Sequence, residues 1–173
     1  MNIIRLFMLG SILMSTTVTV FADQVAVINL RLKAEIIDQS CTVASDSQNI
    51  NVPLGKWLTT SLVNVGDRTT SIPFSIQILD CKAQAVSVSF VGPTDQTNTN
   101  YLALNNTATA GNVAIEILDK DRQILPMGSF STPENSGNSD SLELNFFANY
   151  ISTRGQVTAG NADATANFVL SYH

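Results

Sequence analysis

The feature of this sequence that most restricts its fold is an unbroken two-residue alternation from Ala26 to Ile36. Every second position is apolar, and these positions are Ala26, Ile28, Leu30, Leu32, Ala34 and Ile36. Successive side chains of an extended backbone point to opposite sides, so the pattern predicts a strand with one buried face. Such a strand needs a groove to lie in. The sequence leaves open whether that groove belongs to the same molecule or to a neighbour.

Residues 1–22 have the organisation of a secretory signal peptide. Arg5 precedes an apolar run from Leu6 to Phe21, and Val20-Phe21-Ala22 provides a cleavage site. The apolar run is shorter than the roughly twenty residues that a membrane-spanning helix needs. A retained membrane anchor is the alternative interpretation. We therefore expect an exported chain that begins near Asp23.

Cys41 and Cys81 are the only cysteines in the sequence. An even pair in an exported chain is most simply one disulfide bond. A zinc site would need further Cys or His ligands, and the single histidine is the last residue, His173. The formal net charge of −5 and the lack of a basic patch argue against a nucleic-acid partner.

Short strand-like segments separated by turn residues recur along the rest of the chain, and no segment has a helical period. They cover residues 40–43, 49–54, 72–79, 86–91, 101–104, 112–118, 123–125, 141–151 and 162–172. The last segment repeats the opening pattern, with Ala162, Ala164, Ala166, Phe168, Leu170 and Tyr172 on one face. This spacing predicts an all-β, immunoglobulin-like sandwich.

Catalytic groups are not evident in the sequence. Asp119 and Asp121 could form a carboxylate pair, but both lie in a predicted turn, where aspartate is favoured for its local hydrogen bonds. Terminal His173 has no identifiable nucleophile partner. The single tryptophan, Trp57, could serve a sugar site, although packing in the core or a loop is the simpler interpretation. We expect no enzymatic activity.

Taken in order, several segments resemble subunits of chaperone–usher pili, in particular the minor or adaptor pilins of type 1 fimbriae. The resemblance combines the alternating N-terminal segment, the Cys41–Cys81 spacing, residues 112–119, residues 157–165 and the alternation that ends at the penultimate Tyr172. One position departs from the family pattern, because Ala34 occupies the place where a glycine is usual.

The resemblance implies an incomplete immunoglobulin-like β-sandwich that lacks its last strand and is completed by a donor strand from another chain. Residues 23–36 would be the donor-strand arm, and residues 37–173 the pilin domain. The acceptor groove would lie between the last strand and the strand through Cys41, and would also bind the chaperone. Its expected residues are Ala162, Ala164, Ala166, Phe168, Leu170, Tyr172 and His173, whose carboxylate would anchor the chaperone.

The partners implied are a periplasmic pilus chaperone, an outer-membrane usher, neighbouring pilin subunits and a tip adhesin, with no metal or other cofactor. The chain would pass through the periplasm to a fimbrium at the cell surface. A minor or adaptor subunit is favoured over a major rod pilin by residues 98–104. A carbohydrate-binding adhesin is disfavoured because the chain holds only one domain. A self-contained secreted β-domain, completed by its own arm, is the remaining alternative.

Overall fold

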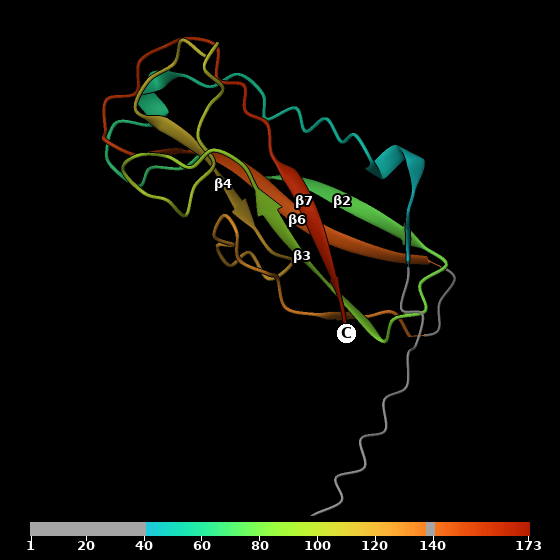
Figure 1. The fold of residues 1–173 in the computed structure, drawn as a ribbon. Coiled ribbons are helices and arrows are strands. Elements are labelled where there is room, and N and C mark those ends of the chain that lie inside the picture. The colour runs from blue at the N-terminus through green and yellow to red at the C-terminus, as the bar shows by residue number, and fades with distance from the viewer. Residues whose placement is uncertain (1–40, 138–140) are drawn as a thin grey trace, which may run out of the picture. The chain divides into compact units, whose positions relative to one another are not determined.

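The computed structural model describes residues 41–137 and 141–173 (Figure 1). The predicted signal peptide and donor-strand arm lie outside these residues. The described residues form seven strands: β1 (Thr42–Val43), β2 (Ile72–Leu79), β3 (Ala85–Val91), β4 (Val113–Leu118), β5 (Glu134–Asn135), β6 (Ser141–Ser152) and β7 (Asn167–Tyr172). They also include two single-turn 3₁₀ helices, η1 (Ser45–Ser47) and η2 (Thr59–Ser61). Neither helix could cross a bilayer, and no other helix occurs in this part of the chain.

The strands form two antiparallel sheets, in the orders β1-β2-β6-β4 and β5-β3-β7. The register pairs Ile76 with Leu144 and Phe74 with Phe146, so that both strands place their apolar residues on one face. The fold is an incomplete immunoglobulin-like β-sandwich, and the predicted fold class is confirmed. The alternation within β2 and within residues 141–146 of β6 explains why these segments bury a single face, whereas the end of β6 buries both.

The core lies between the sheets. It contains Ile76 and Ile78 from β2, Val86 and Val88 from β3, and Leu144 from β6, all at most 1% exposed. Three phenylalanine rings extend it towards one end. The centroids of Phe74, Phe90 and Phe146 lie 5.1–5.8 Å apart, within the range of favourable aromatic contacts.

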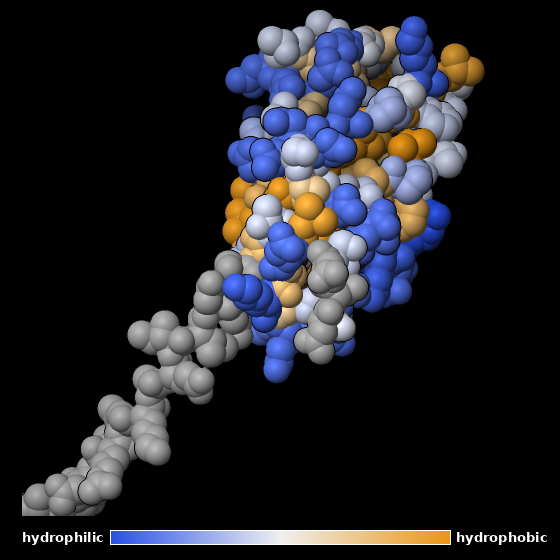
Figure 2. All heavy atoms as spheres, turned by 90° about the vertical axis from the view of Figure 1, so that its right-hand side faces the viewer, coloured by the Kyte–Doolittle hydropathy of each residue, from blue (hydrophilic) through white to orange (hydrophobic). Residues whose placement is uncertain are grey.

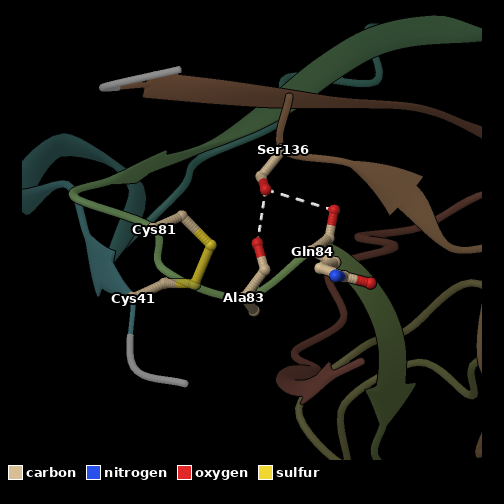
Figure 3. The surroundings of a disulfide bond; sticks show 5 residues. All are labelled: Cys41, Cys81, Ala83, Gln84 and Ser136. Carbon is tan, nitrogen blue, oxygen red and sulfur yellow. Dashed lines mark hydrogen bonds between the residues drawn. A yellow bond between two sulfur atoms is a disulfide. The ribbon is translucent and has the colours of Figure 1, made fainter. Parts of the chain in front are cut away.

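The predicted disulfide bond is confirmed, because Cys41 and Cys81 are bonded (Figure 3). It links the residue before β1 to the loop between β2 and β3. A loop of 40 residues closed in this way stabilises a fold by about 4 kcal/mol in the chain-entropy model. Beside it, the buried Ser136 hydroxyl donates one bifurcated hydrogen bond to the carbonyls of Ala83 and Gln84. The segment after β5 is therefore fixed to the same loop.

An ion pair joins a buried carboxylate of strand β4 to the partly exposed Arg68. The carboxylate of Glu116 is wholly buried and receives two bonds from Arg68, from Nε at 2.8 Å and from Nη2 at 2.9 Å. The Asn149 side-chain amide donates a third bond at 3.1 Å. The hydrogen bonds that Arg68 donates to Glu116 raise the pKa of Arg68 above its usual value. These bonds supply the partners that a buried carboxylate requires.

The predicted strands differ from the structure in two ways. Residues 49–54 belong to no ladder, and residues 101–104 and 123–125 form only isolated bridges; β7 begins at Asn167 instead of Ala162. The second difference follows from the partner strand, because β3 ends at Val91 and the next residues are Gly92 and Pro93. Proline has no N–H to donate, so the ladder has no continuation there. The alternation still buries every second side chain partly from Ala162 to Leu170, whereas the predicted inward residue Tyr172 is 37% exposed.

Candidate functional site

A groove of about 730 Å³ opens the sandwich between residues 48–55 and residues 162–168. Both sheets contribute to its floor, which consists of Phe74, Phe90, Leu102, Ile115, Ile117, Ala148 and Tyr150. Most of these side chains also belong to the hydrophobic core. The groove is therefore an opening into the core and is lined mainly by apolar side chains.

The second wall of the groove differs from the prediction. The resemblance implied a wall formed by the strand through Cys41, whereas residues 48–55, farther along the chain, line the groove. Strand β1 ends at Val43 and is followed by the 3₁₀ helix η1, after which the chain runs along the groove. Ile50, Val52 and Leu54 of this segment pack against the core. Residues 49–54 therefore form a wall of the groove, although their backbone belongs to no sheet.

Strand β7 is the edge strand of its sheet, and β3 is its single strand neighbour in the described part of the chain. The main chains of His173 and Ala85 exchange two hydrogen bonds, of 2.9 and 3.1 Å. Hydrogen-bonded pairs alternate with non-bonded pairs along an antiparallel ladder. The N–H and C=O groups of Phe168, Leu170 and Tyr172 therefore point away from β3, towards the open edge.

The inward side chains of the same segment are only partly covered. Ala164, Ala166, Phe168 and Leu170 pack against the core but remain half-buried. Val88, which lies opposite Leu170 on β3, is fully buried. A strand at the open edge would cover this apolar surface and pair the free main-chain groups at once.

The predicted acceptor residues take different positions along this edge. Ala162, Ala164, Ala166 and Phe168 line the groove, and the Ala162 carbonyl accepts a hydrogen bond of 3.2 Å from the Tyr150 hydroxyl. Leu170, Tyr172 and His173 continue the edge beyond the residues that line it. The His173 imidazole Nε2 lies 3.0 Å from Ser87 Oγ. The six predicted donor residues, Ala26 to Ile36, lie outside the described residues.

The segment before β7 is held by the loop of residues 105–111. The N–H groups of Thr109 and Ala110 donate to the Asn161 carbonyl at 2.9 and 3.0 Å, and Asn105 N–H donates to the Asp163 carbonyl at 2.8 Å. Gly160 allows this approach, because a Cβ atom there would lie 2.3 Å from the Ala110 nitrogen. We did not identify Gly160 from the sequence, where its place within residues 157–165 was the single signal.

Groups that could carry other chemistry have local roles. Asp119 Oδ1 accepts the N–H groups of Asp121 and Gln123 at 2.9 and 2.8 Å, as expected for a turn aspartate. No cluster of three or more potential metal ligands occurs among residues 41–137 and 141–173.

Trp57 lies next to the groove. Its indole N–H donates to the Leu54 carbonyl at 2.7 Å, and Leu54 and Gly55 both line the groove. The side chain remains 40% exposed. Trp57 therefore belongs neither to the core nor to the groove floor.

Known proteins resemble this chain along most of its length. A family described as "Fimbrial protein" matches residues 30–173. The fimbrial-like protein FimF of Salmonella typhimurium is 36% identical over 146 residues, which cover 84% of each chain. The structure of a type I fimbria protein of Burkholderia pseudomallei has 31% identity and a TM-score of 0.62, covering 76% of this chain and 88% of its own. The P pilus rod subunit PapA has a TM-score of 0.67 at 19% identity, covering 77% and 99%, which is a likeness of fold.

Proposed function

This chain belongs to the fimbrial protein family, and we propose on that premise that its groove receives a strand donated by another fimbrial subunit. It is a structural subunit of a chaperone–usher fimbria and not an enzyme. The observation that carries the proposal is the apolar groove beside the free edge of β7. An inserted strand would satisfy the exposed main-chain groups and cover the half-buried side chains of β7.

The donor that we propose is the arm of residues 23–36. Its apolar face, Ala26 to Ile36, suits an apolar groove, and the polar face would remain in solvent. Burial of six apolar side chains would contribute on the order of 10 kcal/mol before the cost of ordering the arm. A link of this strength persists without any covalent bond. Ala34, with one methyl group more than the usual glycine, would be the tightest point of the fit.

We further propose that a periplasmic chaperone covers the groove until an outer-membrane usher passes the subunit to its neighbour. An uncovered groove is an open sheet edge with apolar surface, which favours aggregation. The terminal carboxylate of His173, at the end of β7, would anchor the chaperone. After removal of residues 1–22, the subunit would reach a fimbrium at the cell surface.

The position in the fibre that we favour is that of a minor or adaptor subunit next to a tip adhesin, on the basis of residues 98–104. A major rod subunit is the second candidate, because relatives about as similar include a fimbrial subunit named type 1, at 33% identity. In either position, two copies of this chain that are adjacent in the fibre would be joined when the arm of one enters the groove of the other.

The decisive experiment uses the mature chain, residues 23–173, refolded with and without a synthetic peptide of residues 23–36. We expect the peptide to yield a soluble monomer with a higher melting temperature, and refolding without it to yield oligomers. A peptide carrying Leu30→Asp and Leu32→Asp is the matched control, and it should neither yield a monomer nor raise the melting temperature. A mature chain that is a stable monomer without peptide, and protects its arm from protease, would establish the self-contained domain instead.

A further inference from the structure

We propose that an apolar patch formed by Trp57, Leu58, Val63 and Val65 docks the folded body of the subunit whose arm fills the groove. This inference rests on the proposed function and adds a second contact to it. The occupant is a second copy of this chain. The patch would make each junction of the fibre a two-part interface, with one part in the groove and the other between the folded bodies.

The four side chains are unusually exposed for their size. Their exposed fractions are 40% for Trp57, 74% for Leu58, 47% for Val63 and 69% for Val65. They lie within nine positions of the chain, around the 3₁₀ helix η2. Single exposed apolar residues are common, but a cluster of this kind marks an interaction surface. Apolar surface is also exposed among polar residues on the face shown in Figure 2.

The patch is continuous with the wall of the groove. Leu54 and Gly55 line the groove, and the Trp57 indole is fixed to the Leu54 carbonyl by a hydrogen bond of 2.7 Å. Gly55 has φ +85°, so the chain turns between the wall and Trp57. A molecule that leaves the groove at this end therefore meets the patch directly.

The patch and Cys41 lie at opposite ends of the described sandwich. Val63 accepts a hydrogen bond from Gln156 N–H, and Gly66 N–H donates to the Ser152 carbonyl at the end of β6. At the other end, Thr42 pairs with Leu79, which pairs with Ser141 at the start of β6. Strands β2 and β6 separate the two ends (Figure 1).

The short linker between the arm and Cys41 limits where the folded body of the donor subunit can lie. Only residues 37–40 separate Ile36 from Cys41, so these two residues lie at most roughly 18 Å apart. A donor with Ile36 in the groove must therefore hold its Cys41 end close to one end of the groove. If the arm runs antiparallel to β7, that end is the one at Ala162, beside the patch. Each subunit then contacts its neighbours through opposite ends, and the copies stack in one direction.

Photo-crosslinking tests where the neighbouring copy contacts this chain. A photoreactive benzoylphenylalanine replaces Leu58 in one sample and Tyr172 in another, in mature chains that have been allowed to assemble. We expect position 58 to crosslink to the Cys41 end of the neighbouring copy, and position 172 to give no such product. Crosslinks to that end from position 172, with none from position 58, would overturn the proposal.

Dissociation rates test how much the patch contributes to binding, and they separate this contribution from that of the groove. We compare the variant Leu58→Ser/Val65→Ser with the control Phe130→Ser, which removes a 52% exposed ring outside the patch. Release of the arm peptide should be unchanged in both variants. Release of a whole donor subunit should be about tenfold faster in the double variant alone. If the double variant and the Phe130→Ser control released whole subunits at equal rates, the proposed docking surface would be wrong. If the arm peptide failed to bind the wild-type chain, the proposed function itself would be wrong.

Discussion

Gly160 lies so close to the main chain at Ala110 that a Cβ atom on Gly160 would stand 2.3 Å from the Ala110 nitrogen. Two N–H groups of the same loop donate to the next residue, Asn161, at 2.9 and 3.0 Å. This contact holds the segment that carries Ala162 and Ala164 along the groove. The shape of the groove therefore depends on a residue that does not line it.

Replacing Gly160 by alanine should separate the two segments and distort the groove. Because the close atoms belong to the main chain, they cannot move aside cheaply, and we expect a loss of about 1–3 kcal/mol in stability. Urea unfolding of the peptide-bound chain measures this loss. Asn106→Ala, on an exposed position of the same loop, is the control and should change stability by less than about 0.5 kcal/mol. Equal stability of the two variants would show that the contact is not required.

A charge on the apolar face of the arm should block assembly. We expect Leu30→Asp or Leu32→Asp to prevent attachment to the next subunit, because each would place an ionised carboxylate in an apolar groove. Gel electrophoresis of assembled, unboiled samples reports the polymers. Arg31→Asp adds the same group to the polar face of the arm and should still assemble. Normal polymers from either leucine variant would contradict the assignment of the inward face.

The buried carboxylate of Glu116 should make Arg68 important for stability. Arg68→Met leaves Glu116 buried with a hydrogen bond from the Asn149 amide but without its cation, and we expect a loss of about 2–4 kcal/mol. The estimate is lower than for a fully buried pair because the Arg68 side chain is 46% exposed. The double variant Arg68→Met/Glu116→Leu should recover part of the loss in urea unfolding. An unchanged or larger loss in the double variant would contradict an uncompensated charge as the cause.

Tyr150 should make the stability of the peptide-bound chain sensitive to alkaline pH. Burial is the main cause that raises the pKa of Tyr150 above its ordinary value of 10.0, and the nearby Asp163 adds to it. A raised pKa in the folded state means that the stabilisation is complete below pH 10 and is lost as pH rises through the higher folded value. Deprotonation also removes the hydrogen bond to the Ala162 carbonyl at the groove.

We therefore expect the melting temperature of the peptide-bound chain to fall above about pH 10, with tyrosinate absorbance measured alongside. Tyr150→Phe is the matched variant, since it keeps the ring and removes the hydroxyl. Its melting temperature should start lower and fall less over the same range of pH. Identical pH profiles for the two proteins would exclude Tyr150 as the cause.

The local sequence pattern was sufficient to predict the longer strands of the sandwich. The alternation predicted β2 with its observed bounds, and β3, β4 and β6 to within a residue at each end. The inward faces of β2 and β6 were also predicted, because side-chain direction in a strand depends on position alone. The export signal and an even number of cysteines were enough to predict the bond between Cys41 and Cys81.

The tertiary structure decided which distant segments meet. Residues 49–54 have a strand-like pattern, yet they line the groove outside any ladder, and β7 starts late because β3 ends before Gly92 and Pro93. The ion pair of Arg68 with Glu116 and the contact of Gly160 with Ala110 join residues about fifty positions apart. Alternation states that a face is buried but not which segment buries it, because hydrogen-bond and packing partners depend on the whole arrangement. The sequence by itself therefore predicted two alternating faces, and the fold decided that the one from Ala162 to Phe168 borders an open groove.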